Sequence, residues 1–144
     1  MTRDIVLGVS IHADAATIRG AVTTREGLAS FWTPTVTAEP TVGSRATFGF
    51  SGSPAELTMR VDRIDDEGVG WTCLGAFPFW EGTTITWSFL AEPEHGGTNV
   101  LFVHAGFPDE QPVFENGSIA HTWAMVLDRL KVLAETGAAT PALT

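Results

Sequence analysis

The sequence predicts an α+β domain in which an antiparallel sheet of six to seven strands curls around a long C-terminal helix. Three observations lead to this fold class. They are period-2 alternation near the N-terminus, strand patterns over most of residues 35–105, and one long helical pattern near the C-terminus. The length of 144 residues, 44% of them hydrophobic, fits a single core. We expect one domain over residues 1–136 and a frayed tail over residues 137–144.

The first part of the chain is typical of one strand followed by two short helices. Apolar side chains alternate over Ile5–Ile11, as in a half-buried strand. Asp14 can cap a helix over Ala15–Val22. A second short helix is expected over Arg25–Phe31, and Pro34 ends it because proline keeps the preceding residue out of the helical region.

The middle of the chain alternates between apolar and polar residues in short runs separated by turns rich in Gly, Pro, Ser and Asp. Such short connections favour an antiparallel meander. We expect its strands over Val36–Glu39, Ala46–Phe50, Leu57–Ile64, Val69–Leu74, Thr83–Ala91 and Thr98–Ala105.

The last element is a helix with a broad apolar stripe that includes Ile119, Trp123 and Leu130. Asn116 or Ser118 is the expected N-cap, and Gly137 stands where a helix-ending glycine belongs.

Charge and cysteine content exclude several functions. The chain has 8 basic and 17 acidic residues and a net charge of −9, which disfavours nucleic-acid binding because phosphates are bound by basic patches. No segment approaches the roughly 20 apolar residues of a membrane span, so we expect no membrane insertion. Its one cysteine, Cys73, allows no intrachain disulfide, so we expect a cytoplasmic location. The histidines have no metal-ligand spacing, so we expect no metal or cofactor.

An ordered set of motifs covers roughly residues 4–135. It includes Ile11–Ala15, Leu28–Trp32, Gly82–Leu90, Gly97–Phe107 and Gly117–Lys131. This set resembles the START-like (SRPBCC) superfamily with the helix-grip fold, in the branch named after the activator of heat-shock-protein-90 ATPase. The resemblance implies a hydrophobic cavity between the closing helix and the concave sheet. It leaves the function open, because members are ligand carriers, cyclases, hydrolases, self-protection proteins or chaperone regulators with a role in the stress response.

Large side chains on the predicted inner faces are the candidate ligand-binding residues, since aromatic rings stack against planar apolar molecules. The alternative is that the same side chains simply fill the core. The candidates are Phe48, Phe50, Met59, Trp71, Trp87, Phe89, Phe102, His104, Ile119, Trp123 and Leu127. The loops over residues 75–81 and 106–117 are expected to border the cavity mouth.

His104 shares a strand face with apolar residues, so we expect it to point inward as a neutral imidazole. If the protein is an enzyme, His104 is the candidate acid/base, oriented by a carboxylate among Glu81, Asp109, Glu110 and Glu115. The alternative is a core histidine whose hydrogen bonds are satisfied internally. Cys73 is interpreted as an inert apolar side chain.

Three functions remain open at this stage. The first is binding of a small hydrophobic or aromatic ligand, and the second is a cyclase- or hydrolase-type reaction in the cavity. The third is regulation of a chaperone, although eukaryotic activators carry a further N-terminal domain for which this chain has no room. Met125 and Val132 lie off the main helical stripe and suggest a weak homodimer.

Overall fold

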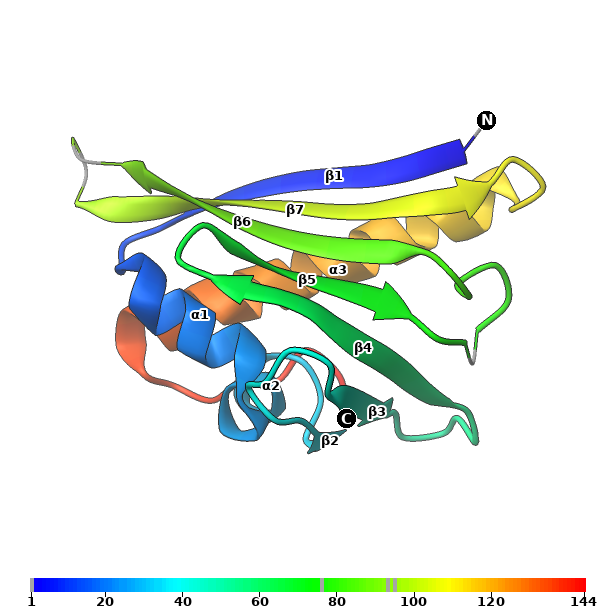
Figure 1. Cartoon of the computed structure of the whole chain (residues 1–144), viewed down its shortest axis with the longest axis horizontal. Helices are drawn as coiled ribbons and strands as arrows, with labels where there is room; N and C mark the ends of the chain where they lie inside the picture. Colours follow the sequence, from blue (N-terminus) through cyan, green and yellow to red (C-terminus); the bar gives the residue numbers. More distant parts are fainter. Residues whose placement is uncertain (1, 76, 93, 95) are drawn as a thin grey trace.

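In the computed structural model of the chain, a seven-stranded antiparallel sheet curls over the long helix α3, with α1 and α2 beside the sheet (Figure 1). The structure describes residues 2–75, 77–92, 94 and 96–144. The elements are β1 (Thr2–Ile11), α1 (Ala15–Thr23), α2 (Arg25–Phe31), β2 (Thr35–Thr37), β3 (Arg45–Gly49), β4 (Glu56–Asp65), β5 (Gly68–Cys73), β6 (Thr84–Glu92), β7 (Gly97–Pro108) and α3 (Val113–Thr136).

The strand order is β1-β7-β6-β5-β4-β3-β2, and each neighbouring pair is antiparallel. The last six strands therefore follow one another as a meander, and β1 joins the free edge of β7. Helices α1 and α2 carry the chain from β1 at one edge to β2 at the other. The predicted α+β helix-grip arrangement, with its curled sheet and long C-terminal helix, is confirmed.

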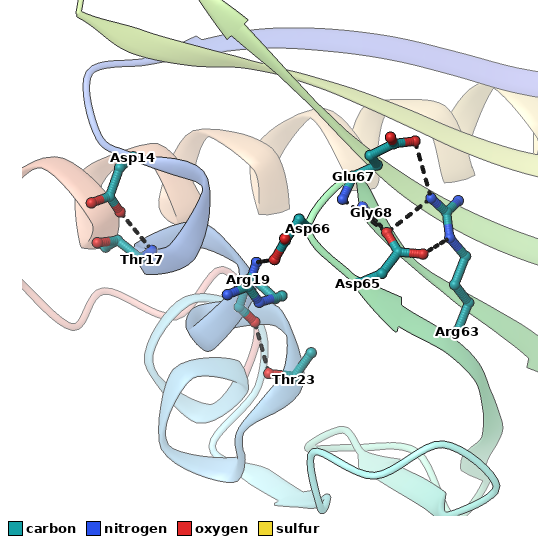
Figure 2. A network of polar contacts seen from close by, with 9 residues as sticks. All are labelled: Asp14, Thr17, Arg19, Thr23, Arg63, Asp65, Asp66, Glu67 and Gly68. Carbon is teal, nitrogen blue, oxygen red and sulfur yellow. Dashed lines mark hydrogen bonds and ion pairs between the residues drawn. The ribbon is translucent and has the colours of Figure 1, made fainter.

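Helix α1 begins as the sequence predicts, because Asp14 Oδ1 accepts a hydrogen bond of 2.8 Å from the Thr17 amide. Further along α1, Arg19 Nη1 lies 3.1 Å from Asp66 Oδ1 in the β4–β5 turn (Figure 2). This ion pair joins α1 to the turn, although the Asp66 side chain is almost fully exposed and water screens the pair.

The β4–β5 turn is organised by Asp65, whose carboxylate accepts hydrogen bonds from the amides of Glu67 and Gly68 (Figure 2). Arg63 also donates to it, with Nε 2.6 Å from Asp65 Oδ2. The Arg63 hydrogen bond, followed by the Glu67 amide, lowers the pKa of Asp65 to about 2. The carboxylate is therefore ionised at neutral pH and holds the tight connection between the two strands.

Helix α3 starts earlier than predicted. Its first residue is Val113, its N-cap is Pro112, and no side chain caps it. The prediction of Asn116 or Ser118 as the cap is wrong, because Asn116 already lies in the first turn and its side chain donates to Gln111 Oε1 at 3.0 Å. The other end is confirmed, since Gly137 is the C-cap in the left-handed region with φ of 78°.

The C-terminal residues, for which we expect a frayed tail, form main-chain hydrogen bonds with the end of α2. The amides of Thr140, Ala142 and Leu143 donate to the carbonyls of Ser30, Phe31 and Trp32 at 2.9, 3.0 and 2.9 Å. These carbonyls stand at the end of α2, where a helix leaves its last acceptors without internal partners. The tail supplies donors that the end of α2 lacks, and composition alone does not reveal these contacts.

Among the helices of the described residues, none is long and apolar enough to cross a membrane.

Candidate functional site

An apolar cavity of about 240 Å³ lies where six segments meet. The segments are the end of α2, the β3–β4 connection, the start of β4, the β5–β6 loop, the first turns of α3 and the C-terminal tail. Eight lining residues are apolar and three carry hydroxyl groups. They are Trp32, Phe50, Ser53, Leu57, Phe77, Trp80, Ser118, Ile119, Thr122, Trp123 and Leu143.

Aromatic rings in contact with one another form most of the wall. The ring centroids of Trp32 and Trp123 lie 4.8 Å apart, and those of Trp80 and Trp123 lie 6.3 Å apart. On the loop side, Phe77 packs edge-to-face on Trp80 at 5.2 Å and lies 5.9 Å from Phe50. Such ring clusters are stiff and offer both faces and edges to a planar guest.

The polar groups of the cavity lie toward its mouth. Ser53 and Ser118 are exposed, so the cavity reaches solvent between the β3–β4 connection and α3. Thr122 donates to the Ser118 carbonyl at 3.1 Å, and Ser53 Oγ accepts weakly from the Ala55 amide at 3.3 Å. None of the described lining residues is charged. A charged guest would therefore lose its hydration without gaining a counter-charge, which disfavours it.

His104 lies behind this wall and takes part in a continuous hydrogen-bond chain. Trp123 Nε1 is 3.1 Å from His104 Nδ1, His104 Nε2 is 2.9 Å from Thr83 Oγ1, and Thr83 Oγ1 is 2.6 Å from the Trp80 carbonyl. An indole N–H only donates and a carbonyl only accepts. The partners therefore fix the neutral tautomer with its proton on Nε2, and Thr83 accepts from His104 while donating to Trp80.

The environment of His104 opposes its protonation. The side chain has no exposed surface, and burial lowers its pKa to about 3. Its Nδ1 lone pair is occupied by Trp123, so the ring offers no free acceptor at neutral pH. This arrangement favours a positioning role, in which His104 holds Trp123 directly and the Trp80 backbone through Thr83.

The structure divides the predicted ligand-binding residues into two groups. Phe50, Ile119 and Trp123 line the cavity. The other eight do not line it and are buried in the core between sheet and helices: Phe48, Met59, Trp71, Trp87, Phe89, Phe102, His104 and Leu127. Alternation correctly assigns these side chains to the inner face but says nothing about how deep they lie, and the deeper ones pack on each other.

Trp87 illustrates the filled part of the core. It packs edge-to-face against Phe102 at 4.9 Å, Trp71 at 5.6 Å and Phe31 at 6.2 Å. Its side chain is fully buried, and its Nε1 finds no hydrogen-bond partner among the residues that the structure describes. The surrounding rings leave no free face for a ligand, so here the aromatic side chains fill the core.

Sequence reasoning missed eight lining residues: Trp32, Ser53, Leu57, Phe77, Trp80, Ser118, Thr122 and Leu143. Phe77 and Trp80 lie on the loop that was expected to border the cavity mouth, and their size was the available signal. Leu143 had no such signal, because its place depends on the tail crossing the end of α2.

The remaining candidate groups are not gathered at the cavity. Among the described hydrogen bonds and ion pairs, His104 shows no contact with Glu81, Glu110 or Glu115. His12 and His121 are exposed, and His95 lies outside the described residues. The described residues contain no group of three or more His, Cys, Asp and Glu that is arranged to hold a metal ion.

Cys73 is buried beside this network, with Sγ 3.4 Å from Met59 Sδ and 3.9 Å from His104 Nε2. Burial raises the pKa of its thiol to about 11. The side chain is therefore a neutral thiol at physiological pH, in keeping with an inert packing role.

Solved structures share the fold over nearly the whole chain. The Aha1 dimer from Colwellia psychrerythraea, solved in solution, is 28% identical, with a TM-score of 0.81 over 94% of this chain and 98% of that chain. SSP2350 from Staphylococcus saprophyticus is 24% identical, with a TM-score of 0.77 over 96% of each chain. MLL2253 from Mesorhizobium loti is 18% identical, with a TM-score of 0.79 over 91% of this chain and 96% of that chain. The last two similarities concern the fold alone.

A search of curated protein sequences found no match. The sequence profile of one family matches residues 12–135, which is most of the chain. The match confirms the resemblance to the START-like superfamily, and the fold and family together support a domain of the ligand-binding type. The chain belongs to the family of activator of Hsp90 ATPase homolog 1-like proteins.

Proposed function

We propose that the protein binds a small, uncharged, largely aromatic molecule in the cavity beside α3. The observation that carries the proposal is the wall itself, in which Trp32, Phe77, Trp80 and Trp123 surround a space without charged groups. An apolar protein cavity of about 150 Å³ accommodates benzene. The volume of about 240 Å³ suits a guest somewhat larger than one ring. The hydroxyl groups at the mouth favour a guest that carries one hydrogen-bonding substituent.

Binding is favoured over catalysis by the state of His104. General base catalysis needs a free lone pair within reach of the substrate and a pKa near the working pH. His104 meets neither condition, because Nδ1 accepts from Trp123 and burial lowers its pKa to about 3.

The test is calorimetric titration of the protein with 1-aminonaphthalene, an uncharged two-ring molecule, and with naphthalene-1-sulfonate, its charged counterpart. We expect saturable binding of the amine at micromolar concentration and much weaker binding of the sulfonate. Ile119→Trp should abolish binding, because Ile119 lines the cavity and the larger ring would fill it. Ala124→Trp is the matched control, since Ala124 is exposed on the same helix and does not line the cavity. Equal loss of binding in both variants, or none in either, would contradict the proposed site.

A weak homodimer is the second element of the proposal. The related protein from Colwellia psychrerythraea was solved as a dimer. In this chain Met125, Val132 and Ala142 line a shallow groove of about 170 Å³ with Asp128 and Arg129. Opposite charges within one patch allow two copies to pair across a two-fold axis. Sedimentation at increasing concentration should show self-association that Met125→Arg removes, and a monomer at every concentration would refute it.

Regulation of a heat-shock chaperone is the alternative function, and the family description supports it. Addition of the protein to purified Hsp90 should then raise the chaperone's ATPase rate. Ile119→Trp separates the two functions, because filling the cavity should leave a surface interaction unchanged.

A further inference from the structure

The C-terminal strap, defined as residues 138–144, forms one wall of the cavity. Three of its amides donate to the last carbonyls of α2, and the Ser51 amide in the β3–β4 connection donates to the Thr144 carbonyl. The strap thus bridges two segments that also contribute cavity residues, Trp32 at the end of α2 and Phe50 in the β3–β4 connection. Figure 1 shows the C-terminus lying beside β3.

Adjacent residues of the strap face two different spaces. Leu143 lines the cavity, whereas Ala142 lines the outer groove with Met125 and Val132. The strap is therefore a thin partition, one chain thick, between the cavity and the outside of α3. Among the described residues that line the cavity, Leu143 is the one that belongs to the strap.

The strap is held by a small number of hydrogen bonds. Its described main-chain bonds are the four named above, rather than a strand ladder, and the Ala138 amide donates to the Thr136 side chain at 3.2 Å. Thr140, Ala142 and Leu143 are half-buried, and within the described part of the chain the buried Thr140 Oγ1 has no hydrogen-bond partner. The rings of Trp32 and Trp80 each pack on Trp123, whereas Leu143 is a half-buried side chain at the edge of the core.

We infer that Leu143 determines ligand size in this cavity, with the strap as its adjustable wall. The inference rests on the proposed function and adds the residue that sets its selectivity. A shorter side chain at position 143 extends the cavity toward the outer groove and admits a longer ring system. A larger side chain shortens the cavity and excludes ligands that the wild-type protein accepts.

The experiment compares two uncharged fluorescent probes, 1-aminonaphthalene with two fused rings and 1-aminoanthracene with three. We expect Leu143→Ala to raise the affinity for the three-ring probe relative to the two-ring probe by about tenfold, as the additional buried ring area suggests. Leu143→Phe should weaken binding of both probes, and more strongly for the larger one. Leu90→Ala and Leu90→Phe are the matched controls, because Leu90 is 57% exposed on β6 and does not line the cavity.

The outcomes separate this inference from the proposed function. If the wild-type protein binds the two-ring probe and both Leu143 variants keep the wild-type ratio of affinities, the inference is overturned and the binding site stands. If no variant binds either probe, the proposed function fails and the inference fails with it. Circular dichroism melts establish that each variant is folded. Should Leu143→Ala not fold, Leu143→Val makes the same comparison with a smaller change of volume.

Discussion

Acidification should destabilise this protein through His104 before most carboxylates begin to titrate. The imidazole has an ordinary pKa of about 6.5, and burial lowers it to about 3 in the folded protein. Between these values the unfolded chain binds a proton that the folded protein does not. Stability therefore rises with pH across this window, is fully present above pH 6.5, and is lost as the pH falls toward 3.

The size of the effect follows from the same two values. Each pH unit below 6.5 costs about 1.4 kcal/mol for one proton, so about 3 kcal/mol is lost on going from pH 7 to pH 4. Small domains have a total unfolding free energy of about 5–15 kcal/mol, so a single buried histidine would remove a large part of it.

The matched variant is His104→Gln, which keeps an acceptor for Trp123 and a donor for Thr83 but does not titrate. Urea unfolding of both proteins at pH 7, 6, 5 and 4, followed by far-ultraviolet circular dichroism, gives the two stability curves. Contributions from other groups, such as Asp65 with its pKa of about 2, are common to both proteins and cancel in the difference. As the pH falls, we expect the unfolding free energy of the wild-type protein to decrease more steeply than that of the variant. The difference in slope corresponds to at most one proton, or about 1.4 kcal/mol per pH unit. A difference that stays constant with pH would refute the neutral, buried state of His104.

Two further predictions concern packing. Gly27→Ala should destabilise the protein by about 1–3 kcal/mol, because the new Cβ would overlap the Ala21 carbonyl oxygen. Gly20→Ala, whose Cβ would meet nothing within 4 Å, should instead stabilise α1 by about 0.5–1 kcal/mol; thermal melts that rank the variants the other way would contradict this account. The Cys73 thiol, with its pKa raised to about 11 by burial, should not react with Ellman's reagent at pH 8 until urea unfolds the chain. Rapid reaction of the folded protein would show that the thiol is accessible.

The fold could be predicted from the sequence because its signals are local. One face of each strand is buried, so alternation marks β4 and β6 directly, with burial patterns that change at nearly every residue. Asp14 and Gly137 are likewise readable, since a cap interacts with residues three or four positions away. The start of α3 could not be predicted from a cap, because that helix begins after Pro112 without a capping side chain.

The candidate site was less accessible to sequence reasoning because a cavity is a gap in packing. Phe48 and Phe50 lie on the same strand pattern, yet Phe48 is buried against Trp32 at 4.2 Å while Phe50 lines the cavity. Whether a phenylalanine of this strand pattern is packed over or lines a cavity depends on segments that are distant in sequence, such as α3 and the C-terminal tail. Leu143 is the extreme case, since its position follows from donors in the tail meeting free carbonyls of α2.

The pairing of β1 with β7 bears on how this protein is made. Ile5 lies opposite His104, so β1 pairs with β7 only after residues 97–108 have emerged from the ribosome. The last carbonyls of α2 acquire their hydrogen-bond donors later still, because those donors are amides of residues 140–143. Contacts so distant in sequence form slowly, and until they form the nascent chain exposes an unpaired apolar strand. Productive folding therefore depends on residues 97–143 being available, and β1 is the segment that needs protection from aggregation until β7 has been made.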